Sequence, residues 1–211
     1  MKMAVLVHSS LKDELLQKIS GIDITIIWAD DIERLIAIED ADAYFDLEFS
    51  NEKKRIDALE KLLPKPIFIN AVTETLHNIG KPFIRINAWN GFLGRAICEA
   101  AAIDEAQKIK AEKIFHQLKW SYRFVPDIPG MVTARIIAMI INEAYFTLQD
   151  EVSTKKEIDI AMNLGTNYPF GPFEWSEKIG LKKIYDLLIE LSKNDDRYEP
   201  AEFMKKEVSG L

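Results

Sequence analysis

The sequence predicts an α/β domain followed by an all-α domain: a reduced Rossmann-like, mostly parallel sheet and then a group of packed helices. In the first ninety residues, short apolar runs rich in β-branched residues alternate with segments that carry apolar residues at helical spacing. Beyond residue 131, helical spacing prevails. Between these regions Pro126, Pro129 and Gly130 interrupt the pattern, which predicts two domains, 1–126 and 127–211.

The first domain is expected to alternate strands and helices. The predicted strands are Met3 to Val7, Ile22 to Trp28, Ala43 to Phe49, Ile67 to Asn70, Phe83 to Trp89 and Tyr122 to Val125. Leu11 to Ile19 and Asn51 to Leu63 carry one apolar face each and predict helices, the second ended by Pro64. Arg95 to Trp120 contains no Pro or Gly and predicts one long helix or two abutting ones.

The second domain is expected to be helical throughout. Met131 to Leu148 is apolar on nearly every side, which predicts a helix surrounded by protein. Thr154 and Glu157 fit a capping box for a helix that Gly165 would close. Pro172 and Gly180 bracket the next helix, since Pro favours the first turn and Gly the end.

Composition excludes several classes of function. The net charge is −7 with 29% charged residues, which disfavours nucleic acid because phosphate binding needs clustered Lys and Arg. No apolar run approaches the roughly 20 residues of a membrane span. The single Cys98 allows no internal disulfide, so a cytoplasmic location is expected. The three histidines and one cysteine are scattered, and no metal site is predicted.

A series of motifs runs through the second half in a fixed order. They are Asp127-Ile-Pro-Gly130-Met-Val-Thr-Ala-Arg135, Asn142-Glu143-Ala144, Ile158-Asp159, Gly165, Tyr168-Pro169-Phe170-Gly171-Pro172-Phe173-Glu174, Gly180-Leu181 and the tail from Arg197-Tyr198-Glu199-Pro200 to Gly210-Leu211. This half resembles the C-terminal domain of 3-hydroxyacyl-CoA dehydrogenases. The resemblance implies acyl-CoA chemistry and a domain that pairs with a second copy, so we expect a homodimer.

The first half resembles the same family more faintly. Ile69-Asn70-Ala71-Val72-Thr73 falls on its Asn-Thr-Ser stretch, and Asn87-Ala88-Trp89-Asn90-Gly91 falls on its His-Phe-Phe-Asn-Pro. Glu99 follows Asn87 by 12 residues, as the family's His and Glu pair requires. The resemblance therefore puts Asn87, Glu99, Asn90 and Thr73 at the catalytic positions.

Two of these positions have lost their chemistry. The family's histidine is a general base, and Asn87 has no titratable nitrogen, which removes a contribution of about 10² to 10⁴ in rate. The family's serine is Ala71 or Val72, with Thr73 the nearest hydroxyl. Glu99 and Arg135 are retained, but Ala134 replaces the asparagine before the arginine.

The dinucleotide site is also reduced. Gly-x-Gly-x-x-Gly lets pyrophosphate approach bare main chain at a helix start, and this chain has His8-Ser9-Ser10-Leu11 there instead. We expect Ser9 or Ser10 to cap the first helix, although the two hydroxyls could hold a phosphate. Asp30 or Asp31 stands near the position of the ribose acid, and the family's long helical excursion after it is missing.

Three functions remain open. The first is a relative of the dehydrogenases without a bound cofactor, which binds an acyl-CoA-like or other small ligand between its domains or assembles with a partner. The second is an active NAD-dependent 3-hydroxyacyl-CoA or 3-hydroxybutyryl-CoA dehydrogenase with a rebuilt site, in which Glu99 or His8 is the base. The third is an oligomeric scaffold, because the helix at 131–148 has more apolar surface than one small domain can cover.

Overall fold

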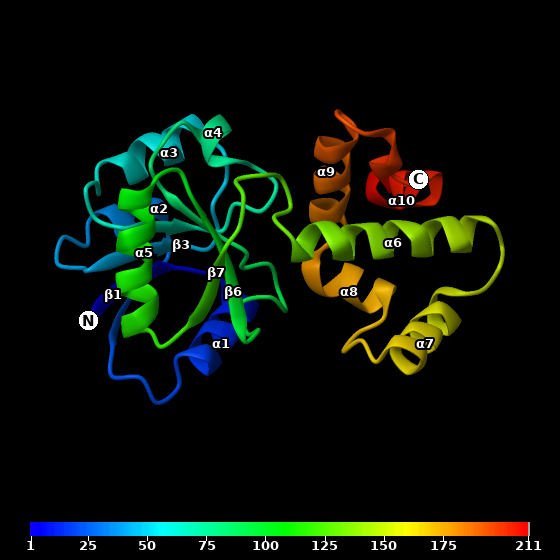
Figure 1. Cartoon of the computed structure of the whole chain (residues 1–211), viewed down its shortest axis with the longest axis horizontal. Coiled ribbons are helices and arrows are strands. Elements are labelled where there is room, and N and C mark those ends of the chain that lie inside the picture. The colour runs from blue at the N-terminus through cyan, green and yellow to red at the C-terminus, as the bar shows by residue number, and fades with distance from the viewer. Residues whose placement is uncertain (211) are drawn as a thin grey trace. The chain divides into compact units, whose positions relative to one another are not determined.

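The computed structural model describes residues 1–210, apart from the Ser9 side chain, and the chain divides into two compact units (Figure 1). The first unit is Met1–Met131 and the second begins at Val132. The boundary therefore lies later than the predicted one after residue 126. Each unit has its own secondary-structure class, α/β in the first and all-α in the second, as predicted.

A seven-stranded sheet forms the centre of the first unit, in the order β2-β1-β3-β4-β5-β6-β7. All neighbouring strands are parallel except β5 and β6, which confirms the mostly parallel sheet. The strands are β1 (Lys2–Leu6), β2 (Thr25–Ala29), β3 (Ala43–Asp46), β4 (Ile67–Ile69), β5 (Ile84–Ile86), β6 (Ile97–Ala102) and β7 (Ser121–Phe124).

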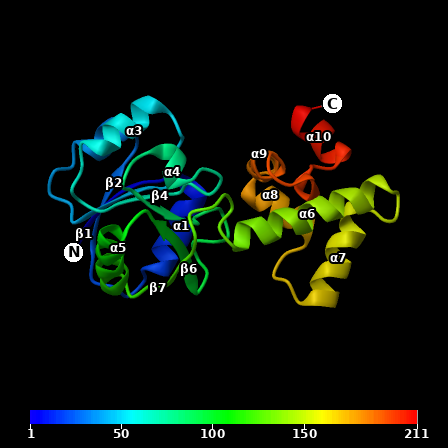
Figure 2. The same cartoon turned by 45° about the horizontal axis from the view of Figure 1, so that its top comes forward.

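Helices cover both faces of this sheet, as Figure 2 shows. Buried side chains of α1 (Ser9–Lys18) and α5 (Glu105–Gln117) form one apolar cluster with the strands. Those of α2 (Ile32–Ile36), α3 (Lys53–Glu60) and α4 (Leu76–Ile79) form a second cluster. The central strands are buried on both sides, which explains their continuous apolar runs.

The helix predicted from Arg95 to Trp120 is wrong in its first part. Ile97–Ala102 forms β6 and pairs with β5, and the helix α5 begins only at Glu105. Asp104 caps α5 by accepting a hydrogen bond from the Gln107 main-chain nitrogen at 2.8 Å. The Ala-rich run in β6 has helical propensity, but pairing with a central strand overrides such local preferences. The cap at Asp104 was the signal of the break.

The second unit is helical, as expected. Its elements are α6 (Thr133–Gln149), α7 (Lys155–Thr166), α8 (Pro172–Ile179), α9 (Leu181–Ser192), the short 3-10 helix η1 (Asp196–Tyr198) and α10 (Glu202–Ser209). The capping box of Thr154 and Glu157 is confirmed, and so is the helix between Pro172 and Gly180. Gly165 does not close α7. Asn167, with a φ of 55°, ends that helix in the left-handed conformation.

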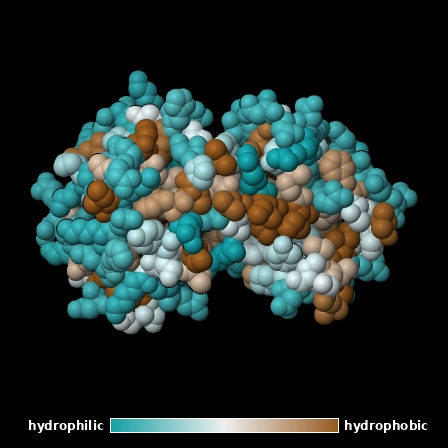
Figure 3. All heavy atoms as spheres, viewed as in Figure 1, coloured by the Kyte–Doolittle hydropathy of each residue, from teal (hydrophilic) through white to brown (hydrophobic). Residues whose placement is uncertain are grey.

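The helix α6 is not buried all round within this unit. Ile136 is 51% exposed and Val132, just before the helix, is 44% exposed. On the neighbouring α7, Ile160 is 48% and Leu164 84% exposed. Figure 3 shows apolar side chains gathered along α6. The second unit therefore carries apolar surface on both helices.

The joint between α7 and α8 is closely packed at Gly171. Asp159 on α7 accepts a hydrogen bond from the Phe173 main-chain nitrogen at 2.8 Å, and Glu174 accepts one from the Gly171 nitrogen at 2.8 Å. A Cβ at Gly171 would lie 2.3 Å from Asp159 Oδ1 and 2.5 Å from its Cα. Because one of these atoms belongs to the main chain, the clash cannot be relieved by a side-chain rotation.

We therefore predict that Gly171→Ala lowers the free energy of unfolding by about 1–3 kcal/mol, through forced movement of α7 against α8. The matched control is Gly165→Ala inside α7, where a Cβ meets no atom within 4 Å. That change should stabilise the protein by about 0.5–1 kcal/mol through helix propensity. Urea unfolding of both variants measures the difference, and equal stability of Gly171→Ala and the parent would contradict the packing argument.

Candidate functional site

The crevice between β1 and β3 is the place where a parallel sheet of this topology binds ligands. The chain leaves β1 for β2 on one side and returns to β3 on the other, so the connections diverge at the carboxyl ends of β1 and β3. His8 follows β1 at this edge, and Leu47 and Glu48 follow β3. The Leu47 main-chain nitrogen donates to the Leu6 carbonyl at 2.9 Å, which draws the two strand ends together.

Glu48 lies against the start of α1. Its Oε1 accepts a hydrogen bond from the His8 main-chain nitrogen at 2.9 Å. Main-chain nitrogens at such a strand-to-helix turn are the groups that hold a phosphate in dinucleotide-binding folds. Here a carboxylate has taken one of them, and its negative charge repels a phosphate oxygen from the same position.

The helix α1 has no side-chain cap at its start. It begins at Ser9, and the N-cap residue is His8, whose side chain makes no capping hydrogen bond. The expectation that Ser9 or Ser10 is the cap is therefore wrong. Ser10 Oγ instead accepts a hydrogen bond from Asn90 Nδ2 at 2.8 Å. The Ser9 side chain, predicted with Ser10 as a phosphate ligand, lies outside the described residues.

The loop after β5 is fastened to α1 at several points. Glu14 of α1 accepts hydrogen bonds from the main-chain nitrogens of Gly91, at 2.6 Å, and Gly94, at 3.4 Å. Within this loop Trp89 and Phe92 are buried and pack edge to face, with ring centroids 6.4 Å apart. Together with the hydrogen bond from Asn90 to Ser10, these contacts hold the loop against α1.

Asn87 and Glu99 lie side by side, as their spacing of 12 residues suggested. The antiparallel register of β5 and β6, with Ile86 opposite Ala100, brings residue 87 opposite residue 99. The Asn87 main-chain nitrogen donates to the Glu99 carbonyl at 3.1 Å, and Asn87 Nδ2 lies 3.4 Å from Glu99 Oε2. Asn87 is buried and Glu99 half-buried. The pair can share a hydrogen bond, but the amide cannot accept a proton near neutral pH.

Asn70 joins the carboxyl ends of three neighbouring strands. Its Nδ2 donates to the carbonyls of Leu47 and Ala88 at 3.1 Å each, and its Oδ1 accepts from the Ala88 nitrogen at 3.0 Å. Because these hydrogen bonds use both the nitrogen and the oxygen of its side-chain amide, Asn70 has a structural role, which the sequence did not predict. Thr73, the nearest hydroxyl to the family's serine position, is half-buried in the loop that follows.

Two acids near the crevice, Asp46 and Asp31, accept hydrogen bonds from the protein itself. Asp46, the last residue of β3, is fully buried and receives two hydrogen bonds of 2.6 Å from Arg55. Burial raises the pKa of the Asp46 carboxyl, and the Arg55 guanidinium opposes that rise. Asp31 caps α2 by accepting from the Arg34 nitrogen at 2.7 Å. Asp30 follows β2 directly and is exposed, so it alone of the two candidate ribose ligands carries no capping bond.

The histidines lie away from Asn87. His8 lies two residues past the end of β1, and β1 is three strand positions from β5, which corresponds to roughly 14 Å between the strand ends at the usual spacing. His77 and His116 are both exposed on other helices. Among residues 1–210 no group of His, Cys, Asp and Glu is arranged to hold a metal ion. In the same part of the chain, no helix has the length and apolar character needed to cross a membrane.

Arg85, which is fully buried, and Asp127, which is partly exposed, form an ion pair that the sequence did not predict. Arg85 is fully buried on β5, donates to the carbonyls of Ala71 at 2.7 Å and Val72 at 3.0 Å, and pairs with Asp127. Burial lowers the pKa of the Arg85 guanidinium, and Asp127 opposes this. The Gly130 nitrogen also donates to the Val72 carbonyl, at 2.8 Å. These bonds hold residues 127–130 on the first unit, which is why it extends past residue 126.

A charged residue between Ile84 and Ile86 in a predicted strand was the available signal for this pair. A charge in such a position is rarely left without a partner. Asp127 also accepts hydrogen bonds from the main-chain nitrogens of Leu76, at 3.0 Å, and His77, at 3.1 Å. The pair therefore links β5, the start of α4 and the chain that leads into the second unit.

The second unit contains a small apolar cavity of about 180 Å³ between α6, α7 and the start of α8. Its lining is mainly aliphatic, with two polar side chains from α6. The residues are Ile140, Glu143, Ala144, Thr147, Ile158, Met162 and Pro172. A cavity of this size and character suits a short apolar group.

Comparison with known proteins finds several dehydrogenases of hydroxyacyl-CoA compounds among the relatives. The 3-hydroxyacyl-CoA dehydrogenase C-terminal domain model matches residues 130–210. The 3-hydroxyadipyl-CoA dehydrogenase of Escherichia coli is 34% identical over 130 residues, 61% of this chain and 27% of that protein. The 3-hydroxybutyryl-CoA dehydrogenase of Bradyrhizobium diazoefficiens is 34% identical over 116 residues, 54% of this chain and 38% of that protein.

Among solved structures, the (S)-3-hydroxybutyryl-CoA dehydrogenase of Ralstonia eutropha superimposes with a TM-score of 0.76. It is 18% identical, and the match covers 99% of this chain and 93% of the other. At that identity the likeness establishes the fold. The aligned part of this chain spans only 27% and 38% of the lengths of the two curated relatives.

The pair of Arg85 and Asp127 yields a stability prediction. Asp127→Asn should lower the free energy of unfolding by about 3 kcal/mol, because the buried Arg85 would lose the carboxylate that contacts it directly. The control is Asp40→Asn, which breaks the exposed pair with Lys2 and should leave stability almost unchanged. Chemical denaturation followed by tryptophan fluorescence measures both. If the two variants lost the same stability, the special role of the Arg85 and Asp127 pair would be refuted.

Proposed function

We propose that this chain, whose residues 130–210 match the 3-hydroxyacyl-CoA dehydrogenase C-terminal domain model, is a member of that family without NAD-dependent hydride transfer. In this proposal the helical unit is the working part, which binds a second copy of the chain and takes an acyl-CoA-like or other small ligand. The α/β unit serves as a support that has lost its cofactor. A cytoplasmic location fits a chain whose one cysteine is a buried free thiol.

The single observation that carries the proposal is the bond from the His8 main-chain nitrogen to Glu48. A pyrophosphate needs several free main-chain nitrogens at this turn and no negative charge nearby. The residues present do not fit the cofactor, since Glu48 supplies a negative charge and no glycine opens the turn. The loop fastened to α1 through Glu14 and Asn90 further restricts this edge of the sheet.

The catalytic position supports the same proposal. A dehydrogenase needs a base that accepts the hydroxyl proton as the hydride leaves, and the base must lie within hydrogen-bond reach of that hydroxyl. Asn87 cannot act as this base, and its amide group is already directed at Glu99. Because Asn87 stands at the position of the family's histidine, there is no imidazole ring here for a neighbouring acid to orient or charge.

The alternative is an active NAD-dependent 3-hydroxyacyl-CoA dehydrogenase with a rebuilt site. It would use His8 or Glu99 as the base. The separation of roughly 14 Å between the ends of β1 and β5 argues against His8 acting on a substrate bound at Asn87. Glu99 is left as the base of this alternative.

We predict that NAD and NADH do not bind at millimolar concentration in isothermal titration calorimetry. We also predict that NADH oxidation with acetoacetyl-CoA stays at the rate of the buffer blank. Asn87→His should not restore turnover, because a restored base does not open the start of α1. The folded state of each variant is checked by its thermal unfolding transition.

Micromolar binding of either nucleotide would refute the proposal and favour the active enzyme. Turnover by the parent that Glu99→Gln abolishes would identify Glu99 as the base of that enzyme. Turnover by Asn87→His alone would mean that only the base had been lost and that the cofactor site still works. Each outcome therefore assigns the loss to a different part of the site.

The exposed apolar residues of α6 and α7 support the homodimer. Ile136 and Leu164 would transfer a large apolar area from water to protein if a second copy covered them, at about 25 cal/mol per Å². A symmetric pair would bury the same residues on both copies, and two-fold symmetric dimers are the commonest soluble oligomers. Separately from the dimer, the small cavity between α6, α7 and α8 would receive the apolar part of a ligand.

We predict a dimer in light scattering, and a mass near 24.2 kDa for Ile136→Glu or Leu164→Glu. A charge at the centre of an apolar interface costs several kcal/mol of association energy if it stays unpaired. The matched control is Ile109→Glu on α5, which is 61% exposed in the other unit and should leave the dimer intact. A parent that scatters as a monomer at high concentration, or a control that also dissociates, would contradict the proposed surface.

A further inference from the structure

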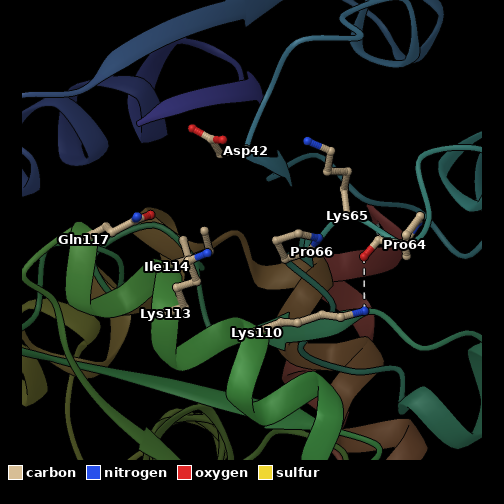
Figure 4. Close-up of a pocket in the computed structure, with 8 residues that line it drawn as sticks. All are labelled: Asp42, Pro64, Lys65, Pro66, Lys110, Lys113, Ile114 and Gln117. Carbon is tan, nitrogen blue, oxygen red and sulfur yellow. Dashed lines mark hydrogen bonds between the residues drawn. The ribbon is translucent and has the colours of Figure 1, made fainter.

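A second pocket lies at the opposite edge of the sheet, where β3 and β4 begin. It is a cavity of about 290 Å³ between the chain that precedes these strands and the outer side of α5. Figure 4 shows its two walls, with α5 on one side. We call it the amino-edge pocket, and its lining is Asp42, Pro64, Lys65, Pro66, Lys110, Lys113, Ile114 and Gln117.

Three lysines line this pocket, from both walls. Lys65 comes from the turn after α3, and Lys110 and Lys113 come from successive turns of α5 (Figure 4). Within the described residues, none of the three forms an ion pair with a carboxylate. Elsewhere in this acidic chain lysines commonly do so, as in the pairs Lys81–Glu60 and Lys155–Glu207. The pocket therefore concentrates cations that the protein does not neutralise by direct contact.

Two of the ammonium groups are held in position by main-chain carbonyls. Lys65 Nζ donates to the Ala41 carbonyl at 3.0 Å, and Lys110 Nζ donates to the Pro64 carbonyl at 3.1 Å. Each ammonium group carries three N–H donors, so two remain for a ligand. Lys113 is exposed and has no hydrogen-bond partner among the described residues, so all of its donors remain. Groups fixed before binding lose little freedom when the ligand arrives.

The remaining lining is one acid and an apolar floor. Asp42 lies at the rim, where its Oδ2 accepts a hydrogen bond from the Lys2 main-chain nitrogen at 2.7 Å. Pro64, Pro66 and Ile114 supply apolar surface between the lysines. Three cations against one carboxylate favour an anion of more than one negative charge. Lysine ammonium groups act as compact point charges that suit a phosphate.

We propose that the amino-edge pocket binds the phosphate group of a small organic anion, with Lys65, Lys110 and Lys113 as its ligands. The volume of about 290 Å³ accommodates a phosphate monoester with a short carbon group against the prolines. The site is separate from the crevice at the carboxyl ends of β1 and β3, because it lies where the parallel strands begin. It is also independent of whether the chain binds NAD.

The experiment is an NMR titration of the full chain at constant ionic strength, with inorganic phosphate, glycerol 3-phosphate and glycerol as probes. The amide signals of residues 64–66 and 110–117 should shift saturably with both phosphates and not with glycerol. Tighter binding of glycerol 3-phosphate indicates an organic ester that contacts the apolar floor. Equal binding of the two indicates that the free anion is the ligand, and both results support a phosphate site.

Variants make the assignment specific. Lys113→Gln is exposed and should fold normally, yet it should weaken phosphate binding by about tenfold, the effect of one charge-assisted contact. Asp42→Asn should tighten binding by about threefold, because it removes the one negative charge in the lining. The control is Lys156→Gln on α7, which also removes an exposed cation but should leave phosphate binding unchanged.

The proposal would be overturned by the absence of saturable shifts with either phosphate. It would also be overturned if Lys156→Gln and Lys113→Gln weakened binding equally, since that would show attraction to net charge alone. A loss of stability in Lys113→Gln together with unchanged phosphate affinity would assign the lysine to the fold and refute the site.

Discussion

An anion bound at the start of a helix uses the main-chain N–H groups there, and in this chain the N–H of the N-cap residue, His8, already donates to a carboxylate. The Glu48 carboxylate accepts its hydrogen bond at 2.9 Å, at the edge of the sheet where the connections diverge. Two effects combine at this position, because the donor is used and a negative charge is added. The loop after β5 packs against the same helix, because Asn90 donates a hydrogen bond to Ser10 and the Gly91 nitrogen donates one to Glu14.

The sequence predicted the fold class and most of the elements, because the apolar patterns are strong where both faces of the sheet are buried. It failed at Ile97–Ala102, where alanines favour a helix locally and pairing with β5 decides otherwise. It also failed at Gly165, which stays inside α7 while Asn167 ends the helix. Glycine needs a special backbone conformation to mark an end, and spacing alone does not reveal that conformation.

The candidate site was predictable in part. The spacing of 12 residues between Asn87 and Glu99 matches the antiparallel register of β5 and β6. The family motif was therefore enough to predict that the two residues lie side by side. Glu48 could not be found in this way, because its contact with His8 joins residues 40 positions apart through a side chain with no motif of its own. Arg85 is an intermediate case. A charged residue inside an apolar strand indicates that an oppositely charged partner is present, but it does not identify Asp127 as that partner.

The carboxyl and amino edges of the sheet differ in the charged side chains that they carry. At the carboxyl edge, Glu48 faces the helix start and repels anions. At the amino edge, Lys65, Lys110 and Lys113 surround a cavity with a single carboxylate. Glu48, Lys65 and Lys110 are each held by a hydrogen bond to a main-chain group, whereas Lys113 is an exposed side chain. If anions bind this domain, the electrostatic field directs them to the edge where the strands begin.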